Sequence, residues 1–198
     1  MADKSDLTAL IGSRICHDLI SPIGAISNGL ELLMLDGTQG GPEMVLIAES
    51  VANANARIRY FRVAYGLALP DQRIGRSEVQ SILADMTIGG RLQIDWQSGA
   101  DLSRGEVKIV FLLLQCLESA MAYGGQVTVI AADEKWQITG RANKLKINTD
   151  LWEVLANPTA TPDITPAFVQ FPLVADELLR RGYRLRTTLG QSEIQLEF

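Results

Sequence analysis

The most informative run of this 198-residue chain is Arg14-Ile15-Cys16-His17-Asp18-Leu19-Ile20-Ser21-Pro22-Ile23, which holds the only histidine in a helical pattern. Apolar residues recur around it in steps of three and four, at Ile15, Leu19, Ile23, Ile26, Leu30 and Leu33. This spacing predicts the buried stripe of an amphipathic helix. At about 100° per residue, His17 falls on the side opposite Ile15 and Leu19, so we expect it to face solvent.

The side of this helix that carries the histidine continues through polar or small residues. They are Arg14, Ser21, Gly24 and Asn28. A second protein could approach closely along such a face. Pro22 follows within the helix and predicts a kink one turn after His17, because proline removes a backbone donor and crowds the preceding turn.

Residues 1–70 predict a hairpin of two long helices. Ser5 is expected to cap a helix that reaches about Leu35, and Pro42 suits the first turn of a second helix that runs to about Leu69. Helices joined by a short loop are antiparallel neighbours. One hairpin leaves its apolar stripes half covered, so we expect a symmetric homodimer that completes a four-helix bundle.

Residues 76–198 predict a second domain in which helices are interleaved with strands. Helices are expected at 77–86, 103–123 and 172–181, and strands at 92–96, 127–130, 136–139, 183–187 and 193–198. The prolines between 157 and 172 predict a loop. Strands that pair mostly with sequence neighbours predict an α/β sandwich with helices on one face of a mixed sheet, so the whole chain is expected to be α+β.

Composition excludes several classes of function. A net charge of −5 and a pI near 4.9 argue against nucleic acid or an anionic membrane as the main partner. The longest apolar run, Ile109 to Leu114, is too short to span a bilayer, and the polar start of the chain does not read as a secretory signal. Two cysteines and one histidine predict neither a disulfide scaffold nor a structural zinc site. We expect a reduced, cytoplasmic protein.

The run His17-Asp18-Leu19-Ile20-Ser21-Pro22 resembles the phosphoacceptor box of two-component histidine kinases. In that family a histidine followed by an acidic residue, leucine and a nearby proline lies on the first helix of a dimeric hairpin. The order of the downstream elements also resembles the ATP-binding domain of those kinases, so the resemblance covers nearly the whole chain.

The ATP-binding motifs of those kinases are not matched. Leu113–Ala120 carries Gln115 and Ser119 where magnesium-holding asparagines are expected, and Thr139–Asn143 lacks the aspartate and second glycine of the motif that reads adenine. Pro166–Pro172 contains no glycine where a phosphate loop is expected. Proline and phenylalanine obstruct the close backbone approach that phosphate binding needs. We therefore expect the chain to bind neither ATP nor another cofactor.

An intact histidine box on a body without nucleotide motifs is similar to the alphaproteobacterial ChpT-type histidine phosphotransferases. The run from Arg14 to Leu33 carries this likeness beyond the generic box. The resemblance implies a dimer that relays phosphoryl groups between receiver domains of a hybrid kinase and of response regulators. Magnesium is then expected on the acidic pocket of the receiver, since this chain shows no ligand cluster of its own.

The resemblance implies that His17 is the phosphoacceptor. Asp18 orients the ring or accepts a proton from its other nitrogen, or else it is a solvated helix carboxylate. Ser21 contacts the phosphoryl group or packs at an interface. Arg14 attracts the phosphoryl group or an acidic receiver, or else it is an ordinary exposed arginine.

The remaining candidates concern docking. Pro22, Gly24 and Asn28 are expected to support the approach of a partner. Arg57, Arg59 and Arg62 lie late in the second helix, where they form part of a docking surface or are simply solvated charges.

Two other functions compete with this interpretation. One is a divergent histidine autokinase that binds ATP in an unusual way and labels His17 directly. The other is a dimeric docking scaffold for receiver domains, in which the histidine has no chemical role.

Overall fold

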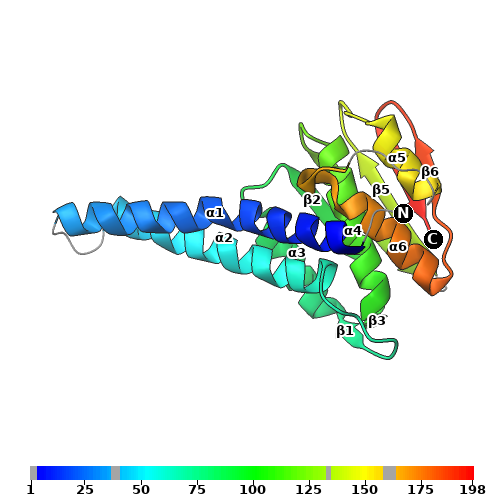
Figure 1. The fold of residues 1–198 in the computed structure, drawn as a ribbon, viewed down its shortest axis with the longest axis horizontal. Coiled ribbons are helices and arrows are strands. Elements are labelled where there is room, and N and C mark those ends of the chain that lie inside the picture. Colours follow the sequence, from blue (N-terminus) through cyan, green and yellow to red (C-terminus); the bar gives the residue numbers. More distant parts are fainter. Residues whose placement is uncertain (1–3, 37–40, 133–134, 158–163) are drawn as a thin grey trace.

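A helical hairpin projects from an α/β body in the computed structural model (Figure 1). The structure describes the chain except residues 1–3, 37–40, 133–134 and 158–163. Helix α1 spans Lys4–Asp36 and α2 spans Pro42–Ala64. The first half of α1 and the end of α2 lie against the body, while the other ends extend away from it (Figure 1). The predicted hairpin is therefore confirmed.

The helix ends differ from the prediction in two places. Ser5 lies inside α1 rather than capping it. Helix α2 ends at Ala64, well before the predicted Leu69. The next carbonyls turn toward the body, since Lys108 Nζ donates to the Gly66 oxygen at 3.1 Å. That contact replaces a further helical turn.

The apolar stripe of α1 is only partly covered within one chain. Ile15 and Leu19 are half-buried, whereas Ile23 and Leu30 are 56% and 46% exposed. Pro22 lies inside the helix and is buried, and the kink expected there stays a prediction. The body therefore covers the stripe only beside the start of α1.

The body contains a small and a larger sheet. Strands β1 (Arg73–Gly75) and β3 (Asp101–Ser103) pair antiparallel and precede helices α3 (Arg76–Thr87) and α4 (Arg104–Ala120). The larger sheet has the order β2-β4-β5-β7-β6, built from Leu92–Gln97, Gly125–Ala132, Lys135–Arg141, Glu193–Glu197 and Arg186–Leu189. Only β2 and β4 are parallel in it. The remaining elements are α5 (Thr149–Ala156), the short 3₁₀ helix η1 (Pro166–Phe168) and α6 (Gln170–Arg181).

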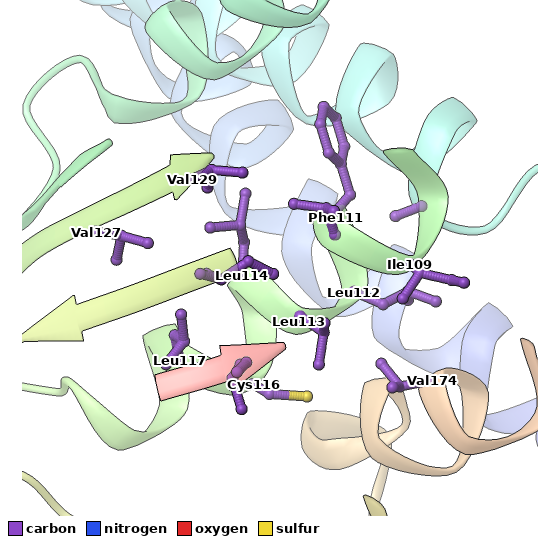
Figure 2. Packing of buried hydrophobic residues seen from close by; sticks show 14 of the residues in the cluster. Ile109, Phe111, Leu112, Leu113, Leu114, Cys116, Leu117, Val127, Val129 and Val174 are labelled. Atoms are coloured by element: carbon purple, nitrogen blue, oxygen red, sulfur yellow. The ribbon is translucent and has the colours of Figure 1, made fainter. Parts of the chain in front are cut away.

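Helix α4 is the centre of the core. Every residue from Ile109 to Leu117 is buried, and burial of one large aliphatic side chain stabilises a fold by roughly 1.5–3 kcal/mol. Val127 and Val129 of β4 meet this helix from the sheet, and Val174 of α6 lies on its other side (Figure 2). Alternation of buried and more exposed residues along β4 and β5 leaves one face of the sheet uncovered. The predicted α+β class, with helices on one face of a mixed sheet, is confirmed.

Some short elements were not predicted. The β1–β3 pair and α5 were missed, and the predicted loop before residue 172 contains η1 and the start of α6. Strand β6 begins at Arg186, not at the predicted Tyr183. The reason is the end of α6, where Gly182 adopts φ 75° and the Tyr183 N–H bonds the Leu178 carbonyl, so Tyr183 completes the helix end.

A buried carboxylate joins α6 to α4. Glu177 accepts from Lys108 Nζ at 2.6 Å and from Arg181 Nε at 3.4 Å, and it also pairs with Arg180. Burial by itself raises the pKa of Glu177, but the hydrogen bonds from Arg180 and Lys108 outweigh burial and lower it below its usual value. The negative charge of Glu177 therefore stabilises the folded state.

Glu177→Gln is expected to lower the free energy of unfolding at pH 7 by about 3 kcal/mol, because Lys108 loses its buried partner. The pKa of Glu177 is lower in the folded state, so its contribution is present above the ordinary glutamate pKa. It is lost as the pH falls through the folded pKa. Urea unfolding between pH 7 and pH 3 should give a flatter acid dependence in the variant. The same dependence in both proteins would contradict this role, and Glu153→Gln, at an exposed position on α5, is the control.

Candidate functional site

His17 lies near the middle of α1, and its side chain is exposed to solvent. Its side chain is 85% exposed, in agreement with the predicted helical face. Nδ1 lies 3.3 Å from Oδ1 of Asp18. Because the two ring nitrogens point in different directions, this contact leaves Nε2 available to an approaching group. Which nitrogen carries the proton depends on the hydrogen bond made by the other.

Asp18 is held in place by positive charge. Its side chain is only 11% exposed, and Oδ2 accepts from Arg14 Nε at 2.7 Å. Arg57 Nη1 lies 3.8 Å from the same oxygen. The alternative of a freely solvated carboxylate is therefore wrong. One oxygen of Asp18 faces cations and the other faces His17.

Arg14 is not the exposed arginine that the helical face suggested. Its side chain is 20% exposed, and Nη1 donates to the backbone carbonyl of Ala167 in η1 at 2.7 Å. Burial by itself lowers the pKa of Arg14, but the hydrogen bond and charge of Asp18 outweigh it and raise the pKa. The guanidinium is thus charged and already engaged with Asp18, while its expected attraction of a phosphoryl group or an acidic receiver stays a prediction.

The other residues predicted on the histidine side of α1 leave it accessible. Ser21 and Asn28 are exposed, and Gly24 is half-buried. A Cβ placed on Gly24 would meet nothing within 4 Å. Pro22 is buried and turns away from this open face. The space beside His17 is therefore open to a second protein.

The three arginines of α2 are not equivalent. Arg57 donates to Asn53 Oδ1 at 3.0 Å and also lies beside Asp18. Arg59 pairs with Asp85 of α3 and so bridges the hairpin to the body, which excludes a simply solvated charge and leaves its docking role a prediction. Arg62 is exposed.

Three features beside His17 could not be found by sequence reasoning. Ile20, three residues on, is 70% exposed; it lies outside the apolar stripe, but it was not identified as a contact residue. The Ala167 carbonyl that meets Arg14 is a backbone atom 153 residues away, which no motif could reveal. A crevice of about 290 Å³ also opens beside Arg14 and Asp18, between the hairpin and the body.

Gln115, at a position where a magnesium ligand is expected, is already hydrogen-bonded within the protein. Gln115 of α4 is 5% exposed, and its Oε1 accepts from the Tyr65 hydroxyl at 2.6 Å. Burial raises the pKa of Tyr65 to about 12, so this hydroxyl stays protonated and donates. Ser119 Oγ donates to the Cys116 carbonyl of its own helix at 2.7 Å. Gln115 therefore joins α4 to Tyr65 at the end of α2, and Ser119 bonds within its own helix.

The segment expected to cradle phosphate is filled by aromatic packing. Phe171 is fully buried and meets Trp152 of α5 edge-on, with ring centroids 5.7 Å apart. Phe168 also lies against the Phe171 ring, with ring centroids 6.5 Å apart. At the position matched to the adenine motif, a Cβ on Gly140 would lie 2.9 Å from Met121 Sδ, so this glycine serves close packing onto α4.

The described part of the chain offers neither a metal cluster nor a membrane-spanning helix. Within it, no group of three or more His, Cys, Asp or Glu residues is placed to hold a metal ion. None of its helices combines the length and apolar character needed to cross a membrane.

Comparison with known proteins relates this chain to phosphotransferases. A family model described as the histidine phosphotransferase C-terminal domain matches residues 76–193. The protein phosphotransferase ChpT of Brucella abortus (strain 2308) is 34% identical over 148 residues, which cover 72% of this chain and 70% of that protein. A solved structure described as a bacterial phosphotransferase shares 29% identity with a TM-score of 0.81, over 100% of this chain and 97% of the other.

Proposed function

Because the chain belongs to the histidine phosphotransferase family, we propose that it relays phosphoryl groups between receiver-domain aspartates through a phosphohistidine at His17. The observation that carries the proposal is the exposed imidazole whose Nδ1 meets Asp18 and whose Nε2 is free to react. The resemblance to this family that the sequence suggested is confirmed. The phosphoryl chemistry at His17 is the proposed step.

The reaction needs little covalent machinery from the protein. The Nε2 lone pair of His17 attacks the phosphorus of a partner's aspartyl phosphate. The N–P bond forms while the acyl O–P bond breaks, and the partner's carboxylate leaves with the bonding electron pair. The proton on Nδ1 stays on the ring and is shared with Asp18, which offsets the positive charge that develops there. Attack by the aspartate of a second receiver on the phosphohistidine completes the relay.

Catalysis then consists of positioning and charge neutralisation. Asp18 orients the ring through Oδ1. Arg57 stands near enough to Asp18 to draw an incoming anionic group toward the site. Magnesium enters with the receiver, whose acidic pocket holds it. No cluster of ligands for that ion occurs among the residues that the structure describes.

An autokinase is the less favoured function. ATP binding by the kinase route needs free magnesium ligands on α4 and a flexible glycine-rich phosphate loop. Gln115 is instead bonded to Tyr65, and the loop position holds the buried Phe171. These residues do not fit a nucleotide. We therefore propose that a partner protein, and not ATP, donates the phosphoryl group.

Receiver domains are the proposed partners, and they dock beside His17. The accessible side of α1 offers Ser21, Gly24 and Asn28 for close approach, with the exposed apolar side chain of Ile20 next to them. Arg62 remains an exposed cation for an acidic receiver surface. The mixture of an apolar contact with nearby cations suits a transient interface between two proteins.

A panel of receiver domains from the same genome tests this function. Each receiver is phosphorylated, purified from its donor and mixed with the protein, and acid-labile phosphate on His17 is followed over time. At least one receiver is expected to lose its phosphate to His17 within minutes. If none transfers, the relay is wrong and only docking remains.

The hairpin is proposed to form a homodimer. Large apolar side chains on both of its helices remain uncovered in one chain. They include Ile23 and Leu30 of α1 and Met44, Val51 and Ile58 of α2, each between 42% and 56% exposed. Uncovered apolar surface of this extent marks an association site. Two copies would complete a four-helix bundle.

A double substitution, Val51→Glu with Ile58→Glu, is expected to convert a dimer into a monomer at micromolar concentration. These positions lie one heptad apart on the exposed side of α2, and two carboxylates there oppose burial against a second copy. Sedimentation velocity measures the change. Glu49→Gln, on the opposite side of α2, should leave the dimer intact. A wild-type chain that sediments as a monomer would contradict the homodimer.

A further inference from the structure

Arg14 connects two segments that lie far apart in the sequence. Its Nε donates to Asp18 Oδ2 at 2.7 Å, and its Nη1 donates to the Ala167 carbonyl at 2.7 Å. Ala167 belongs to η1, which is part of the C-terminal body. The planar guanidinium fork can satisfy both acceptors at once, which a lysine ammonium at the end of a flexible chain cannot do in the same geometry. Only 20% of the Arg14 side chain is exposed, although its bond to the Ala167 carbonyl lies at the surface.

The connection determines how Asp18 faces His17. With Oδ2 held by Arg14, the other oxygen is directed to His17 Nδ1 at 3.3 Å. Arg57 lies on the same side as Arg14, 3.8 Å from Oδ2, and opposes rotation of the carboxylate. A carboxylate fixed in this way selects the tautomer with the proton on Nδ1 and the lone pair on Nε2.

We propose that Arg14 is a positioning residue through which the Ala167 carbonyl of the C-terminal body holds Asp18, and thereby the His17 ring, in the reactive tautomer. This inference rests on the proposed transfer at His17. Through Arg14 and Asp18, the body would thereby take part in positioning the reacting nitrogen. The segment that would carry a phosphate loop in a kinase instead supplies a backbone acceptor beside the phosphoacceptor.

Arg14→Lys tests the inference, because lysine keeps the charge beside Asp18 but loses the fork. Single-turnover transfer from a phosphorylated receiver, measured at saturating receiver, is expected to slow by about 10- to 100-fold. The affinity for the unphosphorylated receiver and the thermal unfolding midpoint should stay as in the wild type. Nitrogen NMR of the imidazole, which needs no receiver, should show protonation moving from Nδ1 toward Nε2.

Arg104→Lys is the matched control. Arg104 Nη2 donates to the Arg62 carbonyl at 2.7 Å, so it also joins the body to the hairpin by an arginine–carbonyl bond, but not through Asp18. The control should keep the wild-type rate and tautomer. A wild-type rate and tautomer in Arg14→Lys, or equal changes in Arg104→Lys, would overturn the inference. Failure of the wild-type protein to accept phosphate overturns the proposed function instead, and the tautomer comparison still decides the role of Arg14.

Discussion

His17→Ala is expected to reduce phosphoryl transfer between receivers to the rate observed without the protein. His17 is the only histidine in the chain, so no second imidazole can form a phosphohistidine. Alanine is a strong helix former, and the removed side chain is 85% exposed, so α1 should stay folded. Transfer of label from one purified receiver to another, with unfolding followed in parallel, measures the effect.

The neighbouring Cys16→Ala is the control for this loss. Cys16 is exposed on the same turn of α1 and has no part in the proposed chemistry. Its substitution should leave the relay at the wild-type rate. Transfer that persisted in His17→Ala would remove the chemical role of the histidine and leave the docking scaffold as the function.

Phe111→Ala is expected to lower the free energy of unfolding by about 3–5 kcal/mol, because it opens a large cavity in the core. Phe111 is fully buried where the hairpin meets the body. Its ring stacks on Tyr60 of α2 at 4.7 Å and meets Trp96 of β2 edge-on at 6.3 Å. The Tyr60 hydroxyl also donates to the Phe111 carbonyl at 2.6 Å. Urea unfolding measures the change.

Tyr123→Ala is the matched aromatic control. Tyr123 is 66% exposed, and its ring carries only the ammonium of Lys144 at 5.2 Å from the centroid. Its removal should lower the free energy of unfolding by less than about 1 kcal/mol. A similarly small loss in Phe111→Ala would mean that Phe111 does not join the hairpin to the body.

Long elements with a clear period were predictable from the sequence, and short ones were not. Helix α1 carries regular apolar spacing from Ile15 to Leu33, and α4 has a continuous apolar run, so the local sequence predicts both helices. Strands β1 and β3 have three residues each and exist because they pair with each other across the start of α3. No local pattern encodes such a pairing. The end of α2 was likewise set by Lys108, a residue of another helix.

The site divides in the same way. The exposure of His17 follows from its helical angle, and the local box pointed to Asp18. The burial of Arg14 depends on η1, which the loop-like prolines of that segment concealed. The sequence alone gives no partner for Arg59, whereas in the fold α3 places Asp85 beside it. The spacing of residues in the sequence therefore does not predict which distant residue a single side chain will contact.

The proposed relay is tested most directly by identifying which molecule donates the phosphoryl group to His17. The purified protein is incubated with labelled ATP and magnesium alone, and in parallel with a receiver that carries the same label on its aspartate. Label that is stable to base and labile to acid is then counted on His17. The proposed relay predicts label on His17 from the phosphorylated receiver and none from ATP. Robust labelling of His17 by ATP alone would contradict it and make the chain an autokinase.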